Sequence, residues 1–412
     1  MLTHLLRPGV AAYEPPARTL GETILSLAAV SPVRTDVPTS MSNTDTPSGT
    51  GVDRGALERY LEEQFGPAES FEATEQDGGS SNRTVFVAWG ERELVLRCAP
   101  EHDRVPYLLH DVLGEYEMLT ALTGTAVPVP QPVASCADTS VLGVPFYLMD
   151  RVGGEILGGE EPARFATPGR RQRVGELVID TLASLHTVEY DSSEVRAVPE
   201  GTTAEAVEAH VRNLEDALGT TGRDLGRALE VGEWLREHVP EPPARTLVHG
   251  DYKPDNTMMA PSEIPQVAAV LDWEMAGAGN PRADLGWLLN YWSEAADPDP
   301  ITPEFEERYG DHELYGTVTE YTREDSTFMA HPSYPSRAEL VDRYERRTGI
   351  EYRHDRFYRA LGLFKLMTIC ERFYEAYLES PGTAKDTYPM MELIPPVLAE
   401  RAALVVDGET RL

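Results

Sequence analysis

The first patterned part of the chain combines a helical repeat with three segments that alternate apolar and polar positions. Apolar residues spaced by three and four positions predict a short amphipathic helix; they are Leu57, Tyr60, Leu61 and Phe65. Residues 71–75, 84–89 and 94–97 then alternate, separated by the turns QDGGSSN and GER. Because a period of two indicates half-buried strands, the pattern predicts a helix followed by a three-stranded antiparallel meander.

A second helix and a buried strand are predicted after the meander. The helix has one apolar stripe, formed by Val112, Leu113, Tyr116, Leu119 and Leu122. The segment VPVPQPV at 127–133 is excluded from a helix or a central strand, because proline has no backbone N–H to donate. VPFYLMDRVGG at 144–154 predicts a buried strand that runs into a flexible connector. This connector is the predicted hinge between two lobes.

The remainder of the chain is predicted to be mainly helical, with a strand and a hairpin in its middle. Apolar positions at offsets of 3, 4, 7, 8 and 11 from Val174 predict a helix. We interpret His186, at its end, as a packing or capping residue. Further helices are predicted over 225–234 and 357–378. Residues 247–248 predict a strand, and the apolar runs 257–259 and 267–271 flank the turn APSEIPQ and predict a β-hairpin.

The chain is strongly acidic. Its 412 residues include 69 Asp and Glu against 36 Lys and Arg, which gives a formal net charge of -33, and the lysines are Lys253, Lys365 and Lys385 alone. The acids are spread along the chain, which is typical of a surface adapted to high salt, where the screening length falls to about 3 Å at 1 M. The composition predicts a halophilic, cytoplasmic protein. It argues against nucleic acid as a partner, because no basic face emerges.

Cysteine usage and hydropathy exclude two further classes of protein. Cys98, Cys136 and Cys370 are widely spaced and form no C-x-x-C pattern, so neither a disulfide framework nor a zinc site is predicted, and the compartment is predicted to be reducing. No apolar run approaches the about 18 to 20 residues that a membrane span requires. We therefore expect no integral membrane segment.

Composition also predicts where the domains lie. Residues 1–52 are predicted to be a disordered tail, because 31–51 are rich in Pro, Ser, Thr and Gly. The apolar patch 24–30 has acidic flanks that do not fit a signal peptide, and Met41 is an alternative start that an intact-mass measurement tests. Residues 53–150 are expected to form an N-lobe, 151–396 a C-lobe, and 397–412 a C-terminal helix or tail.

The stretch LVHGDYKPDN at 247–256 carries the strongest chemical signal. Asp251 lies in the loop after a strand, and Pro254 stiffens that loop. Because a hairpin returns its last residue to its first, we expect Asp272 to lie beside Asn256. Carboxylate and amide oxygens suit Mg²⁺, which usually takes one or two protein carboxylates together with phosphate oxygens. Asp251 is then left to accept a proton from an attacking hydroxyl.

The N-terminal meander contains candidate nucleotide contacts. Glycines and small hydroxyls in the first turn let backbone N–H groups approach a phosphate, although a plain hairpin loop is the alternative. Arg97 ends the third strand and is a candidate cation for the same phosphates. Glu115 is either its ion-pair partner or one more solvated acid. The predicted nucleotide-binding set is Gly78, Gly79, Ser80, Ser81, Asn82, Arg97, Glu115 and Met149.

HGDYKPDN, followed by VLDWEMAGAGNPRADLGWLL, resembles the aminoglycoside phosphotransferase and choline kinase-like family. The match is most similar to the branch often fused to acyl-CoA dehydrogenases. GGSSNRTVFV, LVLRCAP, GEYEMLTAL, VPFYLMDRVGG, LASLH and LVDRYERRTGI extend the resemblance over about residues 55–395. It implies an α+β, two-lobed protein-kinase-like fold: a small antiparallel-sheet N-lobe with one main helix, and a larger, mainly helical C-lobe.

The resemblance also implies roles for individual residues. Asp251 resembles the catalytic base, Asn256 and Asp272 the magnesium ligands, and Glu274 a second acidic residue at the metal site. His249 is implied to brace the loop. Asp284 resembles an aspartate that supports the catalytic loop, with helix N-capping as its alternative.

The sequence departs from the kinase pattern at two places. Asp272-Trp273-Glu274 stands where protein kinases have D-F-G, and Arg97 stands where most kinases place lysine. Arginine can still bridge phosphate oxygens.

Two functional classes follow from these motifs. The first is an ATP- and Mg²⁺-dependent kinase that phosphorylates a hydroxyl of a small metabolite; the second is a catalytically silent pseudokinase that binds nucleotide. The motifs G-x-S-x-G and H-E-x-x-H are absent, as is a strand followed by G-x-G-x-x-G, so hydrolase, zinc peptidase and dinucleotide chemistry is not indicated.

The acceptor pocket is expected between residues 291–327 and the helix over 357–378. Its acids are candidates to receive an ammonium group, although acids are common throughout this chain. The branch resemblance favours a hydroxyacyl-type acceptor over an antibiotic. The large apolar side chains of this part, which line the pocket or belong to the core, are Trp287, Trp292, Phe364 and Phe373.

Overall fold

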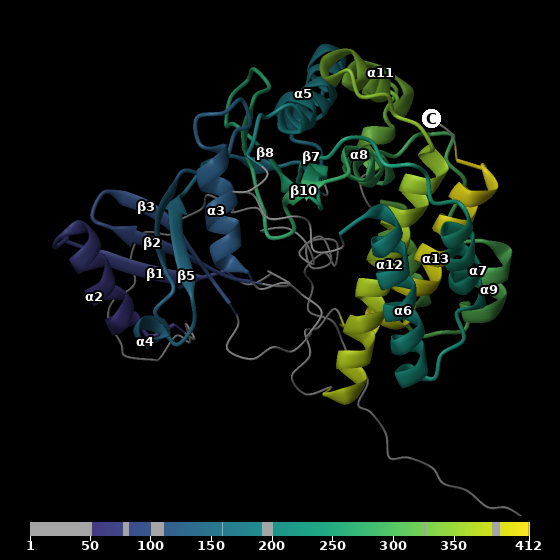
Figure 1. Ribbon diagram of the computed structural model, residues 1–412, viewed down its shortest axis with the longest axis horizontal. Helices are drawn as coiled ribbons and strands as arrows, with labels where there is room; N and C mark the ends of the chain where they lie inside the picture. The colour runs from purple at the N-terminus through teal and green to yellow at the C-terminus, as the bar shows by residue number, and fades with distance from the viewer. Residues whose placement is uncertain are drawn as a thin grey trace, which may run out of the picture.

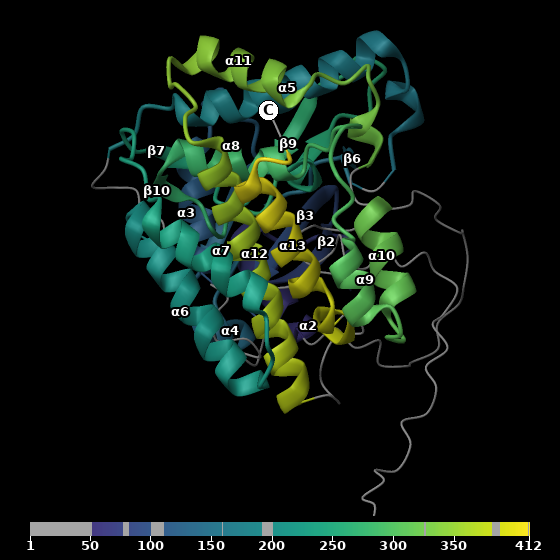
Figure 2. The ribbon, with the colours of Figure 1, turned by 90° about the vertical axis from the view of Figure 1, so that its right-hand side faces the viewer.

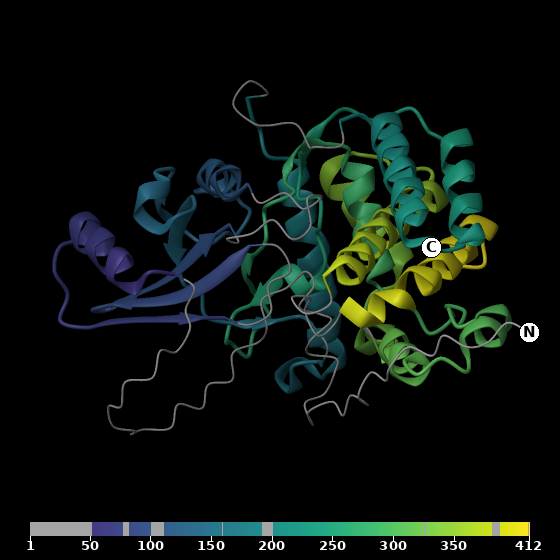
Figure 3. The same cartoon turned by 90° about the horizontal axis from the view of Figure 1, so that it is seen from below.

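The computed structural model describes residues 52–76, 82–99, 111–158, 160–191, 201–324, 327–380, 388–410 and 412. Within these, a lobe built on a small antiparallel sheet lies beside a larger helical lobe, as Figures 1 and 3 show. This is the α+β, two-lobed arrangement that the sequence predicts. The predictions for the N-terminal tail and for Gly78, Gly79, Ser80 and Ser81 lie outside the described residues.

The N-lobe is a five-stranded antiparallel sheet with the strand order β1-β2-β3-β5-β4. The predicted helix and the three predicted strands are confirmed, and the proline-rich segment leads into the edge strand β4 rather than a central one. The elements are α2 (Arg54–Phe65), β1 (Phe71–Glu75), β2 (Arg83–Trp89), β3 (Arg92–Cys98), α3 (Val112–Leu122), β4 (Pro132–Cys136), α4 (Thr139–Leu142) and β5 (Phe146–Asp150).

The two faces of this sheet have different roles. Alternate residues of β2 and β3, including Val85 and Leu96, are buried in one apolar cluster with Leu57 of α2. The period of two therefore sends Arg97 to the opposite face. There it lies in register with Thr84 on one side and Tyr147 on the other. The sheet's apolar face forms the core of the lobe, while its other face presents a cation.

Two long helices form the centre of the C-lobe. In Figure 2, α12 (Asp355–Glu379) and α13 (Ile394–Asp407) run side by side, with α6 (Thr203–Thr221) and α7 (Gly226–Glu237) on one side and α9 (Pro303–Tyr309) and α10 (Tyr315–Glu324) on the other. The other elements are β6 (Glu155–Ile156), α5 (Pro168–His186), β7 (Thr246–Val248), β8 (Thr257–Met259), β9 (Val267–Val270), β10 (Gly277–Gly279), α8 (Pro281–Asn290) and α11 (Arg337–Thr348), with short 3-10 turns at Ala163–Phe165, Pro254–Asn256, Thr327–Ala330 and Tyr388–Glu392.

In this lobe α5, α7, α12, β7 and the hairpin of β8 and β9 lie where the sequence predicts them, whereas no helix was predicted over α6, α9, α10 or α11. The predicted strand at 247–248 and the hairpin of β8 and β9 are present, and β8 also pairs with β6. No helix was predicted over α6, although Val207, Val211, Leu214 and Leu218 are buried at helical spacing along it. One continuous helix, α13, crosses the boundary predicted at 397. Because α13 packs on α12 and α7, the lobe continues through it.

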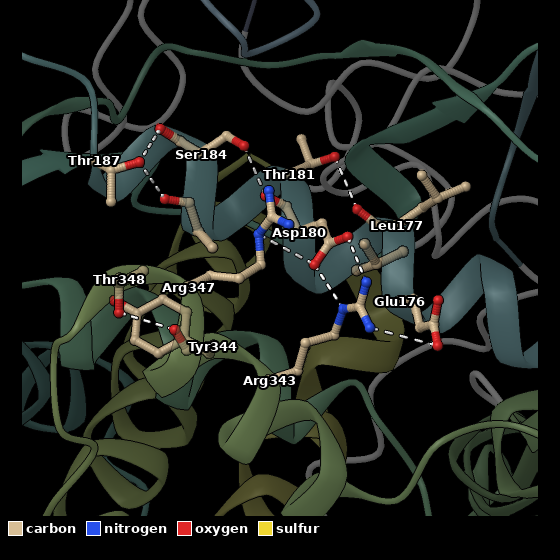
Figure 4. Close-up of polar contacts among 12 residues, drawn as sticks. Glu176, Leu177, Asp180, Thr181, Ser184, Thr187, Arg343, Tyr344, Arg347 and Thr348 are labelled. Carbon is tan, nitrogen blue, oxygen red and sulfur yellow. Dashed lines mark hydrogen bonds and ion pairs between the residues drawn. The ribbon is translucent and has the colours of Figure 1, made fainter.

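Helix α11 is fastened to α5 by ion pairs. Arg343 donates to Asp180 through two bonds of 2.6 and 2.8 Å, and Arg347 lies 3.3 Å from the same carboxylate. Glu176, one turn earlier on α5, lies 3.5 Å from Arg343. Figure 4 shows these charges facing one another across the two helices, with Tyr344 on the same helix as Arg343 and Arg347. The pairing fixes α11, and hence Tyr344, relative to the end of α5.

Two smaller expectations concern cysteines and membranes. Cys98, Cys136 and Cys370 form no disulfide bond in the described part of the chain. None of the helices in the described part of the chain combines the length and apolarity that a membrane span requires.

Candidate active site

The backbone of the loop at 249–251 is held by one carboxylate. Asp284, in the first turn of α8, accepts the N–H of His249 at 2.7 Å and that of Gly250 at 2.8 Å. Gly250 has φ 82, and a Cβ there would lie 2.7 Å from the carbonyl oxygen of Met275, so only glycine fits. The supporting role implied for Asp284 is thus confirmed. The alternative, N-capping, is wrong, because Asn280 caps α8.

Asp284 is itself held by a buried pair that the sequence did not reveal. His186 Nε2 lies 3.2 Å from Asp284 Oδ2, and His186 Nδ1 lies 2.6 Å from the hydroxyl of Tyr344. Burial alone raises the pKa of Asp284, but its interactions with His186 and His249 together outweigh burial, and this pKa lies below its ordinary value. We call Asp284, His186 and Tyr344 the loop brace. His186 is a packing residue, as interpreted, that also orients the loop.

His249 braces the same loop from within, as the resemblance implies. Its ring is fully buried, and burial lowers its pKa. Nε2 lies 2.9 Å from the carbonyl oxygen of Leu271, which can only accept, so Nε2 carries the hydrogen. Nδ1 is then free to accept the N–H of Asp251 at 3.3 Å. Both ring nitrogens are therefore engaged in holding backbone.

Asn256 clamps Asp251. Its amide nitrogen donates to the backbone oxygen and to Oδ2 of Asp251, each at 2.9 Å. This fixes the amide orientation and leaves Asn256 Oδ1 buried without a hydrogen-bond partner. Lys253 Nζ lies 3.5 Å from the same Oδ2. Burial lowers the pKa of Lys253, but nearby carboxylates, Asp251 first, outweigh burial, and this pKa is raised, so Lys253 stays charged.

Asp272 follows β9 at the position that the hairpin predicts. The preceding residue, Leu271, donates its N–H to the backbone oxygen of Asn256 at 2.9 Å, so the hairpin brings the two segments together. Asp272 has φ 66, in the left-handed region that non-glycine residues rarely adopt. Burial raises its pKa to about 6, with further contributions from Glu115 and Asp251 that Arg97 opposes.

Arg97 on the N-lobe sheet contacts this aspartate of the C-lobe. Its side chain is buried, donates to Thr84 at 3.0 Å and to Asp272 at 3.1 Å, and lies 3.5 Å from Glu115. The open question about Glu115 is settled: it is the ion-pair partner of Arg97. Glu115 also accepts the N–H of Trp273 at 3.3 Å. The direct pairing of Arg97 with Asp272 was not predicted, because nothing local in the sequence joins β3 to the loop after β9.

The remaining predicted residues lie around this centre. Asn82 is buried and donates to Glu274 at 3.1 Å, which joins the end of the first turn to the C-lobe. Met149 pairs with Val95 in the sheet and immediately precedes the end of β5 and the connector. The oxygen atoms that could bind a metal lie on the loop at 249–256 and just after the hairpin. The N-lobe contributes the guanidinium of Arg97 and the amide of Asn82.

A cavity of about 140 Å³ opens beside Asp251, and we call it the Asp251 pocket. Trp287 and Phe373 line it, whereas Trp292 and Phe364 are fully buried elsewhere and belong to the core. The predicted segments contribute α10 and α12 residues, but the wall supplied by α13 was not predicted. The lining residues are Asp251, Lys253, Asp255, Asp272, Glu274, Met275, Trp287, Asn290, Tyr291, Tyr321, Thr322, Gly362, Leu363, Lys365, Leu366, Ile369, Cys370, Phe373, Ile394, Val397, Leu398 and Arg401.

The oxygen atoms near Asp251 fit a magnesium ion whose remaining coordination positions are filled by a bound phosphate ligand and water. Across the described residues, no group of three or more His, Cys, Asp and Glu side chains is placed to hold a metal. The buried, unpaired Oδ1 of Asn256 and the crowded carboxylate of Asp272 nevertheless offer two oxygens to a hard cation. Mg²⁺ commonly binds one or two protein carboxylates and takes its other ligands from phosphates and water.

Comparison with known proteins gives a consistent picture. Residues 72–322 match the Phosphotransferase enzyme family. Acyl-CoA dehydrogenase family member 11 of Gallus gallus is 30% identical over 364 residues, which are 85% of this chain and 43% of that protein. Member 11 of Homo sapiens is 27% identical over 357 residues, which are 84% of this chain and 42% of that protein. Member 10 of Mus musculus is 28% identical over 348 residues, which are 83% of this chain and 30% of that protein. The chain thus spans less than half the length of these relatives. The resemblance to the dehydrogenase-associated branch is confirmed.

Solved structures agree on the fold. A crystal structure from Ralstonia eutropha JMP134, described as an aminoglycoside phosphotransferase, is 25% identical with a TM-score of 0.60, covering 85% of this chain and 99% of that one. The GDP complex of a mutant aminoglycoside 2'-phosphotransferase IIIa is 16% identical with a TM-score of 0.55, covering 87% and 100%. These likenesses establish the two-lobed kinase-like fold.

Proposed function

The chain belongs to the Phosphotransferase enzyme family, and we propose that it is a kinase that transfers the γ-phosphoryl group of ATP to a hydroxyl of a small-molecule acceptor. One observation carries the proposal: Asn256 is fixed by two bonds to Asp251 and keeps a buried oxygen unpaired beside the hairpin that bears Asp272. An ordinary structural loop has no reason to bury an unsatisfied amide oxygen, because doing so costs about 1–3 kcal/mol.

Asp251 is the base in this proposal. Its Oδ2 is engaged by Asn256 and Lys253, while its Oδ1 has no hydrogen-bond partner in the described part of the chain. Asp251 lines the pocket, so Oδ1 is the atom that we assign to the acceptor hydroxyl and its proton. The clamp by Asn256 aligns this oxygen, and positioning of this kind supplies much of the catalysis in phosphoryl transfer.

The hairpin and the sheet supply the charges around the phosphates. Asn256 and Asp272 would hold Mg²⁺, with Glu274 as a second acid. When bound, the ion neutralises charge on the phosphoryl oxygens. Arg97, oriented by Glu115, is proposed to bridge phosphate oxygens in the place where most kinases use lysine. The turn that ends at Asn82 is proposed to cover the same phosphates.

The acceptor and the setting are also proposals. The similarity to acyl-CoA dehydrogenase family members 10 and 11 favours a hydroxyacyl-type acceptor over an aminoglycoside. The net charge of -33 supports a cytoplasm of high salt as the working environment. Activity is therefore best sought in molar KCl.

The decisive test replaces Asp251. Asp251→Asn should retain ATP binding and lower turnover by a factor on the order of 10² to 10⁴, because the amide cannot accept the proton. The assay incubates the protein with ATP, Mg²⁺ and a cell extract, and detects new phosphorylated species by mass spectrometry. Asp216→Asn, on the exposed face of α6, is the matched control and should behave as wild type.

The alternative is a pseudokinase that binds nucleotide without turnover. The replacement of lysine by Arg97 is the observation that favours it. The pseudokinase would be supported, and the kinase proposal rejected, by three results together: calorimetry shows nucleotide binding, no extract yields a phosphorylated product, and wild type and Asp251→Asn do not differ.

A further inference from the structure

We propose that α11 positions the loop that carries Asp251, and that Arg337 and Arg343 are positioning residues for the reaction. This inference rests on the proposed function, since it concerns the placement of the proposed base. The two arginines act through α8 and α5, the helices that carry Asp284 and His186. The contacts that α11 makes with both helices carry the proposal.

The loop brace joins the ends of two helices. His186 is the last residue of α5, and Asp284 lies in the first turn of α8. Their side chains meet at 3.2 Å, and Asp284 accepts the N–H groups of His249 and Gly250. Because a helix is kept in shape by its own backbone hydrogen bonds, a shift of either helix moves the brace and the loop with it. Contacts that fix α5 and α8 relative to each other therefore also fix the loop.

Arg337, the first residue of α11, holds the end of α8 that lies away from the brace. Its Nε donates to the backbone oxygen of Leu289 at 3.2 Å and to that of Trp292 at 2.8 Å, in the last turn of α8 and just beyond it. The guanidinium also donates to Asp297, and Arg337 is only 2% exposed. The helix dipole favours a cation at this end of a helix, and burial limits screening by salt. Arg337 thus fixes α8 against the start of α11.

Arg343 and Tyr344 hold α5 at two points. Arg343 donates two bonds to Asp180, at 2.6 and 2.8 Å, and the hydroxyl of Tyr344 lies 2.6 Å from His186 at the end of α5. The side chain of Asp180 is 15% exposed and that of Arg343 is 28% exposed, so water and salt screen this pair less than a fully exposed one. Figure 4 shows Arg343 and Arg347 both directed at Asp180. Adjacent residues of α11 therefore fix the orientation of α5 as well as its position.

The three helices also meet directly at the start of α11. The indole N–H of Trp292, just after α8, donates to the backbone oxygen of Pro335 at 2.8 Å. A Cβ on Gly175 of α5 would lie 2.4 Å from the ring of Pro335 and 3.1 Å from Trp292, so only glycine allows this approach. The ion pairs of α11 therefore act on helices that are already in close contact.

A helix can also stabilise a lobe without positioning a particular loop, and the two roles predict different results. If α11 acts only on the stability of the lobe, loss of Arg343 increases opening throughout the lobe. If α11 positions the loop, the amides of His249 and Gly250 lose protection while those of α12 keep theirs, because local opening needs less free energy than global unfolding.

Amide hydrogen exchange of the nucleotide-free full chain measures this difference without depending on turnover. In Arg343→Met, we expect the amides of His249 and Gly250 to exchange about fivefold faster than in wild type, and those of α12 to stay within about twofold. Arg346→Met is the matched control, because that side chain is 63% exposed and pairs with Asp342 of the same helix. Unchanged exchange in the loop, or an equal increase in α12, would overturn the proposal.

Kinetics then separate positioning from nucleotide binding. In the extract assay, Arg343→Met should lower kcat by about tenfold, because small displacements of a catalytic group are costly. KM for ATP should stay within about twofold, because the N-lobe residues proposed to hold the phosphates are unchanged. Arg343→Lys keeps the charge but cannot form two parallel bonds, so it should recover about threefold of the lost kcat. A raised KM with an unchanged kcat would contradict a positioning role.

Arg337→Met tests the contact with α8. The exchange of the same loop amides should rise by about fivefold or more, because the variant leaves a buried carboxylate and two carbonyl groups without their donor. Thermal unfolding checks that the variant folds, since Arg337 is buried; if it does not fold, Arg343→Met decides alone. A folded Arg337→Met whose loop exchanges as in wild type would show that α11 does not position the loop through α8.

The two proposals fail separately. Faster loop exchange in the variants, with no phosphorylated product from wild type, leaves the role of α11 in holding the loop and removes the kinase function. Turnover by wild type that both folded variants retain, with loop exchange unchanged, leaves the kinase and removes the role of α11.

Discussion

The catalytic loop and the Asp251 pocket share Asp251, yet they satisfy their polar groups in different ways. In the loop, the N–H groups of His249 and Gly250 both bond to Asp284, which is itself held by the rest of the loop brace. In the pocket, Trp287 keeps an unpaired donor and Arg401 forms no ion pair with a described residue. The loop is therefore held by bonds within the protein, whereas these two polar groups of the pocket are free to meet the acceptor that we propose.

Removing the central carboxylate of the brace should have the largest effect on stability. Asp284→Ala leaves the N–H groups of His249 and Gly250 and the ring of His186 without their acceptor in a largely buried place. We expect the free energy of unfolding to fall by about 3–5 kcal/mol, since unpaired buried donors retain their full desolvation cost. Urea unfolding at pH 7 measures the loss.

The control for this change is Asp216→Ala, on the exposed face of α6, which should alter stability by less than about 0.5 kcal/mol. A loss below about 1 kcal/mol in Asp284→Ala would mean that the loop is not held from within. The contrast between loop and pocket would then disappear.

Asp272 lies next to the loop and also lines the Asp251 pocket. Its replacement should therefore have opposite effects on stability and on activity. Its pKa is raised from 3.8 to about 6, so the protonated carboxyl group contributes most to stability below pH 4, and this contribution is lost as the pH rises through 6 and the group ionises. At pH 7, Asp272→Asn should therefore raise the free energy of unfolding by about 1–3 kcal/mol. Asparagine also tolerates the left-handed φ of 66. Turnover should fall by a factor on the order of 10² or more, because the proposed metal ligand is lost.

The measurement is chemical unfolding of both proteins at pH 4, 5, 6 and 7 without divalent ions. The difference between variant and wild type should grow over this range. If Asp272→Asn is less stable than wild type at pH 7, then the pairing with Arg97 outweighs burial. The carboxylate would then stabilise the fold, as Asp284 does.

The parts of the molecule that the sequence predicts best are those where neighbours along the chain decide the structure. The period of two in 84–89 and 94–97 predicts the central strands, and the hairpin after Asn256 predicts where Asp272 returns. The roles implied for Asp284 and His249 came from resemblance, and hydrogen bonds agree with them. Helix α6 was not predicted, although its buried residues, among them Val207 and Leu218, are at helical spacing.

Contacts between distant segments could not be predicted in the same way. His186 meets Asp284 across 98 positions and Tyr344 across 158, and Arg97 meets Asp272 across 175. No local period or spacing records such pairs, because they follow from how helices and lobes pack. The wall that α13 adds to the pocket was missed for the same reason: Arg401 reaches the site only because α13 packs along α12.

The smallest predicted effect concerns the far end of the loop brace. Tyr344→Phe removes the hydroxyl that lies 2.6 Å from His186 Nδ1, while the ring keeps its buried place against α5. One neutral hydrogen bond contributes about 1 kcal/mol, so urea unfolding should show a loss of that size, and kcat should fall less than in Asp284→Ala. Tyr377→Phe is the matched control, because that hydroxyl bonds to no described residue. An unchanged stability in Tyr344→Phe would show that the brace ends at His186, and that α11 supports the loop through packing alone.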